Sequence, residues 1–166
     1  MNLQALLNKT ECWAQQELAA QQRMLELLGR QEAAIAAGSA AEIVASGEAI
    51  QAHLRAGPAR ENHRQELVRR FAQAWGVAPG TLTLQGIAER AEAAGLAAGR
   101  LRRAREELRD AGASVLRRGR RIAAMARFHQ GLLSELLGVF LSAGGAGAAQ
   151  IGSRAEAGGV LVDQEA

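Results

Sequence analysis

Residues 84–141 read LQGIAERAEAAGLAAGRLRRAREELRDAGASVLRRGRRIAAMARFHQGLLSELLGVFL and contain no proline. The stretch carries a heptad seam, a spacing typical of a long helix that packs against other helices. Seven-residue steps connect Ile87, Ala94, Leu101, Leu108, Val115, Ile122, His129 and Leu136. The second seam position, three residues after each of these, has two charged exceptions, Arg90 and Arg118. We therefore predict one helix over 84–141.

Glycines interrupt this predicted helix, among them Gly95, Gly99, Gly112 and Gly119. Each costs a helix about 1 kcal/mol relative to alanine. Two interpretations stay open. The glycines, with the neighbouring alanines, would let another helix approach closely, or they reflect only the coding bias that also favours arginine over lysine.

A first helix is predicted over 3–37, because leucines recur in it at three- and four-residue steps. Asn2 is a suitable N-cap, and Gly38 is a suitable left-handed stop. Ser39 and Glu42 then have the spacing of a capping box at the start of a second helix. Such a short connection folds the second helix back antiparallel on the first.

The second helix is predicted over 40–75. Pro58 removes a backbone donor, so we expect a kink or break near Ala56–Gly57. Residues 76–80, GVAPG, end the helix, and Thr81 or Thr83 is expected to cap the helix that follows.

The composition supports an all-α fold, because aromatic residues make up only 3% of the 166 residues and there are two prolines. We predict an elongated antiparallel three-helix bundle, with residues 1–141 as a helical domain. Residues 142–166 start with a glycine-rich stretch and lose all periodicity, so they are expected to form a flexible, disordered tail.

The end of the third helix is predicted to overhang the bundle. At about 1.5 Å per residue it would be about 85 Å long, against about 55 Å for each of the other two. Ten of the twenty residues 122–141 are large and apolar. Burying each is worth about 1.5–3 kcal/mol, so a partner surface is expected, unless the bundle is shifted or the helix bends back. The expected contacts are Ile122, Met125, Phe128, Leu132, Leu133, Leu136, Leu137 and Phe140.

No constellation typical of catalysis stands out. His53, His63 and His129 lack metal-ligand spacing, and phosphate-binding and nucleophile motifs are missing. The single cysteine, Cys12, is expected to be a small buried hydrophobe. We predict a protein that is not an enzyme, with no cofactor, no metal and no small-molecule substrate. The N-terminus lacks a signal sequence and no segment could span a membrane, so a cytoplasmic location is expected.

An arginine-rich run offers a competing interpretation. Ten arginines and three acids give residues 100–127 a local charge of +7, which could neutralise phosphates. However, no aromatic residues interleave the run and no helix-turn-helix pattern accompanies it. A solvated helix face is therefore favoured over a nucleic-acid site.

Several motifs together resemble the FlgN family of flagellar type III export chaperones. They are a leading helix with paired leucines and glutamines, Arg60-x-x-x-Arg64-x-x-Leu67-Val68-x-x-Phe71-Ala72-x-x-Trp75-Gly76, Thr81-Leu82-x-Leu84, Leu132-Leu133-x-x-Leu136-Leu137, and Ile151-Gly-Ser-Arg154 followed by Val160-Leu-Val-Asp163. The resemblance covers nearly the whole chain.

This resemblance implies a cytoplasmic chaperone that holds hook–filament junction proteins and delivers them to the flagellar export gate. In that family the C-terminal part of the long helix receives an amphipathic helix of the substrate, which here corresponds to residues 122–141. The family often has Asn before the double leucine, where this chain has Arg127 and His129. It often has a gate-docking Tyr in the tail, where this chain has Ile151. A coiled-coil oligomerisation module and an arginine-driven nucleic-acid binder remain the alternatives.

Overall fold

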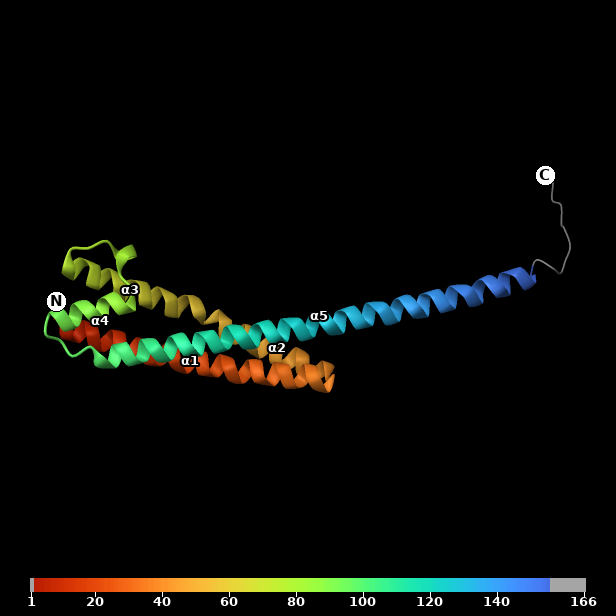
Figure 1. The fold of residues 1–166 in the computed structure, drawn as a ribbon, viewed down its shortest axis with the longest axis horizontal. Helices are drawn as coiled ribbons and strands as arrows, with labels where there is room; N and C mark the ends of the chain where they lie inside the picture. The colour runs from red at the N-terminus through yellow and green to blue at the C-terminus, as the bar shows by residue number, and fades with distance from the viewer. Residues whose placement is uncertain (1, 156–166) are drawn as a thin grey trace, which may run out of the picture. The chain divides into compact units, whose positions relative to one another are not determined.

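The computed structural model describes the backbone of residues 2–155 and the side chains of residues 2–142. Its elements are α1 (Leu3–Ala37), α2 (Ala40–Arg55), α3 (Gly57–Trp75), the 3-10 turn η1 (Pro79–Thr81), α4 (Leu84–Ala93) and α5 (Gly99–Ala155) (Figure 1). No strand occurs among residues 2–155, so the predicted all-α class is confirmed.

The chain divides into two units, Met1–Ala123 and Ala124–Ala166, and the boundary lies within α5. In the first unit, α1 packs against both α2 and α3. The chain reverses after α1, so that α2 and α3 return along it, and the first part of α5 follows α1 in the same direction (Figure 1).

Both ends of α1 lie where the sequence predicts them. The side chain of Asn2 accepts from the backbone N–H of Gln4 at 2.9 Å, which confirms the N-cap. At the other end Gly38 has a φ of 66°, and the N–H of Ser39 donates to Ala34 O at 3.1 Å. The predicted capping box is wrong, since Ser39 makes no side-chain cap bond. The Ser39 N–H that Glu42 would need is already used to finish α1.

The predicted helix over 40–75 is two helices, α2 and α3, separated at Ala56. Pro58 lies in the first turn of α3, where its missing N–H costs nothing. The break near Ala56–Gly57 is therefore confirmed. Thr83 caps α4, because its Oγ1 accepts from the N–H of Gly86 at 3.1 Å.

The prediction of one helix over 84–141 is wrong, because α4 ends at Ala93 and α5 begins at Gly99. Gly95 has a φ of 76°, a left-handed conformation that ends a helix and that L side chains rarely adopt. The N–H of Leu96 donates back to Ala91 O at 2.9 Å, which completes the Schellman motif.

Helix α5 also continues to Ala155, beyond the expected end at 141. The expected tail over 142–166 therefore begins inside this helix. Residues 156–166 lie outside the part of the chain that the structure describes, so the expectation of a flexible segment there stays a prediction.

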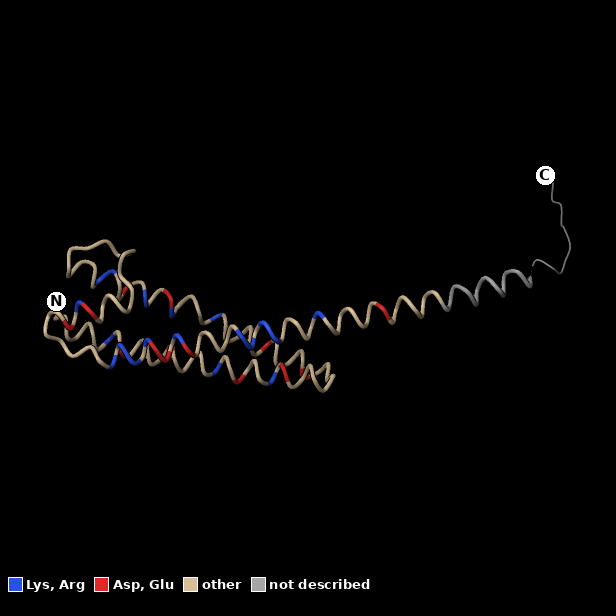
Figure 2. The backbone as a smooth tube through the Cα atoms, in the orientation of Figure 1, with Lys and Arg blue, Asp and Glu red and all other residues tan. Residues whose placement is uncertain are grey.

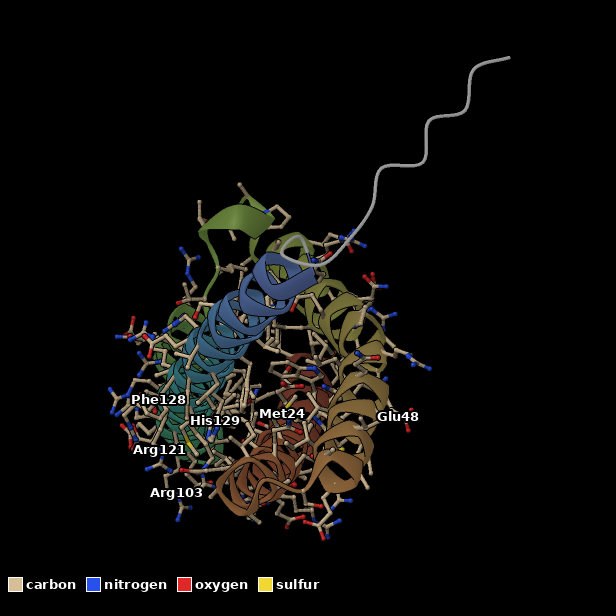
Figure 3. All side chains as sticks on the ribbon, turned by 90° about the vertical axis from the view of Figure 1, so that its right-hand side faces the viewer. Met24, Glu48, Arg103, Arg121, Phe128 and His129 are labelled. Atoms are coloured by element: carbon tan, nitrogen blue, oxygen red, sulfur yellow. The ribbon has the colours of Figure 1, made fainter. Side chains whose placement is uncertain are left out.

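The core of the first unit joins α1, α3, α4 and the start of α5. Trp13 donates its indole N–H to Arg60 O at 3.1 Å, and the ring of Phe71 stacks on that of Trp75 with centroids 4.8 Å apart. Met24 points into the interior of the same unit (Figure 3). The largest fully buried side chains are Phe71, Leu7, Ile87, Leu101 and Thr10.

One smaller expectation is wrong, and one of the two open interpretations of the glycines does not hold in the first unit. Cys12 is exposed, and its Sγ accepts from the side-chain amide of Gln16 at 3.7 Å. Gly112 and Gly119 do not mark a close helix approach, because a Cβ built on either would meet nothing within 4 Å. Neither of these two glycines therefore marks a tight packing contact in the first unit.

Truncation of Phe71 tests this core. We expect Phe71→Ala to lower the free energy of unfolding by about 3–5 kcal/mol, because it opens a cavity at a side chain with no exposure. The control is Leu116→Ala on α5, whose side chain is 62% exposed, and it should change that energy by less than about 0.5 kcal/mol. Thermal or urea unfolding measures both, and equal effects would contradict this core.

Candidate partner-binding face

Helix α5 presents a continuous set of large apolar side chains in the second unit. They lie between residues 125 and 140, and Met125 is half-buried while the others are exposed. We call this set the apolar face. Its members are Met125, Phe128, Leu132, Leu133, Leu136, Leu137, Val139 and Phe140.

The apolar face has a central ridge and two flanks. Successive residues of a helix are about 100° apart around its axis, which places Leu132 and Leu136 in the middle. Phe128 and Val139 lie on one side of this ridge, and Leu133 and Leu137 lie on the other. The exposures agree, since Leu136 is 46% exposed and shielded by its neighbours, whereas Leu137 on the flank is 61% exposed.

Charge is scarce on this part of α5. Among residues 124–141 only Arg127 and Glu135 carry a permanent charge, and Figure 2 shows the long uncharged stretches around them. His129 lies beside Phe128, with the two rings edge to face and their centroids 5.9 Å apart (Figure 3). A surface so poor in charge can bind an apolar partner without desolvating many ions.

Between Gln130 and Gly138 the strip opposite the ridge is small and polar, and the exposed Leu141 lies on it one heptad after Ser134. Ser134 turns its hydroxyl inward and donates to Gln130 O at 2.9 Å. A Cβ at Gly131 or Gly138 would meet nothing within 4 Å. Helix α5 is therefore amphipathic here, although its polar side carries little charge.

The eight predicted contact residues have different environments. Six of them are exposed in the second unit, Met125 is half-buried in that unit, and Ile122 is half-buried in the first unit. The prediction omitted Val139, which is 63% exposed and lies on the apolar face. Its apolar character and its seven-residue spacing from Leu132 were the signals that could have included it. The backbone of Ile151 belongs to α5, but its side chain lies outside the described residues.

The arginine-rich run is partly neutralised by acids that lie far away in the sequence. Glu32 on α1 pairs with Arg121, whose Nη2 lies 2.8 Å from Oε2, and with Arg118, whose Nε lies 3.3 Å from Oε2. Arg102 pairs with Glu92 on α4. These ion pairs lower the positive charge that the run offers to a phosphate backbone.

The charged exceptions in the predicted seam have structural roles. Arg118 donates through Nη1 to Leu25 O at 2.9 Å, and this nitrogen would lie 3.3 Å from a Cβ at Gly29. Gly29 thus leaves room for the guanidinium against α1. Arg90 lies over the ring of Trp75, 6.0 Å from its centroid, in a cation–π contact.

Neither a metal site nor a membrane span is found in the described part of the chain. No three His, Cys, Asp or Glu side chains there come together as metal ligands could. Among the same residues no helix combines the length and the apolar character that crossing a membrane requires.

Comparison of the chain with protein-family models, with curated proteins and with solved structures finds no match. The proposed function therefore depends on the sequence and the structure of this chain.

Replacing Arg118 tests its role between α1 and α5. We expect Arg118→Ala to lower the free energy of unfolding by about 1 kcal/mol, because the hydrogen bond to Leu25 and one ion pair of Glu32 are lost at a partly exposed site. Chemical unfolding measures the loss. Arg120→Ala, at an exposed position of the same helix, is the control and should be nearly neutral. A loss no larger than that of the control would mean that Arg118 is merely solvated.

Proposed function

We propose that the chain is an export chaperone of the FlgN type, located in the cytoplasm. It would bind the C-terminal segments of flagellar hook–filament junction proteins and deliver them to the export gate. The observation that carries this proposal is the exposed apolar face of α5, together with the family resemblance of the motifs around it.

The size of the apolar face supports a binding role. Most soluble monomers expose no contiguous apolar patch larger than about 300–600 Å². An aromatic side chain has about 150–250 Å² of surface, so Phe128 and Phe140, which are 69% and 72% exposed, alone leave roughly 200–350 Å² in water. The four leucines and Val139 of the face, which are 44–63% exposed, add to this area. An amphipathic client segment that packs its apolar side on this face would remove apolar surface from water.

Two alternatives use other features of the chain. A coiled-coil oligomer would cover the same face with a second copy, and light scattering coupled to size exclusion separates a monomeric chaperone from a stable oligomer. A nucleic-acid binder would use the arginines of α5. The ion pairs of Arg102, Arg118 and Arg121 weaken that alternative.

Docking at the export gate is assigned to the C-terminal segment by resemblance. Ile151 would take the place of the Tyr that the family often has there. This part of the proposal is separable from client binding, because it rests on a different residue.

A double substitution on one flank tests client binding. We expect Leu133→Asp with Leu137→Asp to reduce affinity for the C-terminal segment of a junction protein more than 100-fold. The two carboxylates would have to enter an apolar contact without a counter-ion, which costs several kcal/mol. Isothermal titration calorimetry with that segment measures the affinity.

The matched control is Ser134→Asp with Gly138→Asp, which adds the same charges at the same spacing on the opposite strip. This variant should bind normally. If the flank variant instead loses its cooperative melt, the flank is part of an intramolecular core and the proposal fails. If it melts normally and binds as tightly as the unmodified chain, the binding site is elsewhere.

A further inference from the structure

The apolar face is wider than one partner helix can cover. With about 100° between successive residues, the arc from Phe128 across the ridge to Leu137 spans roughly 180°. A two-stranded helix pair uses a narrower seam, two positions in each heptad. One helix seated on the ridge of Leu132 and Leu136 would therefore leave the outer side of both flanks in water.

The heptad pattern also indicates an apolar face that is wider than a two-stranded seam. Leu136 continues the first seam position, and Met125, Leu132 and Val139 occupy the second. A third position, directly after the second, is also apolar and holds Ala126, Leu133 and Phe140. Three apolar positions in each heptad are typical of helices that face the core of a bundle, whereas a two-stranded seam uses two.

The exposed area fits this larger occupant. Seven of the eight side chains of the apolar face are between 44% and 72% exposed, and they lie on both flanks as well as on the ridge. A single helix over half of the arc would leave about half of this area exposed, which alone is a substantial patch for a soluble protein.

We infer that the apolar face takes two helices of the client at the same time, one along each flank, and that the three helices form a bundle with Leu132 and Leu136 at its centre. The inference rests on the proposed function. Glu135 lies one turn before Val139, on the flank that also holds Phe128, so the client helix on that flank presents a basic residue there. The helix on the Leu137 flank meets no permanent charge and is apolar at its contact.

A second copy of this chain is a poorer occupant. A simple pair of copies would cover the ridge only, and Leu137 and Phe128 would stay in water. Charged side chains would also fix the axial register of the two paired helices only weakly, since residues 124–141 hold only the charges of Arg127 and Glu135.

Cysteine protection tests the inference on the full chain. Cys12→Ser first removes the exposed native thiol, and single cysteines then replace Phe128, Leu137 or Ser134. The probe is a full-length junction protein from the same genome, added in excess, and the rate of alkylation by a maleimide is measured. We expect the client to slow alkylation at least about tenfold at Phe128→Cys and at Leu137→Cys, and to leave Ser134→Cys unchanged, because thiol reactivity follows exposure.

The outcomes separate this inference from the proposed function. Protection of one flank only overturns the two-helix inference and leaves the chaperone proposal standing. Failure of the unmodified chain to bind any junction protein overturns both. Protection of both flanks without client, with a doubled mass in solution, assigns the face to a second copy and overturns the inference.

A second measurement covers the case in which a cysteine itself weakens binding. Phe128→Asp and Leu137→Asp, each made alone, should both reduce client affinity at least about tenfold. Ser134→Asp should not. A one-helix occupant would tolerate one of the two flank variants, and that result would also overturn the inference.

Discussion

The packing of the first unit depends on where its helices stop, and glycine in the left-handed conformation sets three of these stops. Gly38 ends α1 and reverses the chain, Gly76 ends α3, and Gly95 ends α4. In an unbroken helix, Ile87 and Leu101 would be about 21 Å apart along the axis. Because the chain turns at Gly95, both are fully buried in the same core.

The second unit differs, because none of the large side chains described there, up to residue 142, is fully buried. The first unit buries Phe71 and Leu101 completely, whereas the larger part of the Phe128, Leu133 and Phe140 side chains is exposed. Leaving such residues in water is unfavourable by roughly 1.5–3 kcal/mol each. A binding partner that covers these side chains would remove this cost, and this is the simplest explanation for their exposure. The family resemblance also implies a partner at this part of α5.

Local signals in the sequence predicted what local interactions decide. The bounds of α1, the cap at Asn2 and the break before Pro58 all follow from residues close together in the chain. The stop at Gly95 was missed because the heptad spacing continues through the turn, from Ala94 to Leu101. The ion pairs of Glu32 with Arg118 and Arg121 join residues far apart in sequence, so no local pattern could reveal them. The apolar face was predicted from composition, but the division into a ridge and two flanks needed the exposures.

The central claim is that residues 128–140 form a binding surface and are not part of the folding core. Amide hydrogen exchange of the full chain, with and without a junction protein, tests it most directly. The account predicts slow exchange around Phe71 and Leu101 in both samples, and exchange over 128–140 that is faster than in this core when the chain is alone and slow when the client is bound. Core-like protection of 128–140 in the chain alone, at a concentration where it is monomeric, would contradict the account.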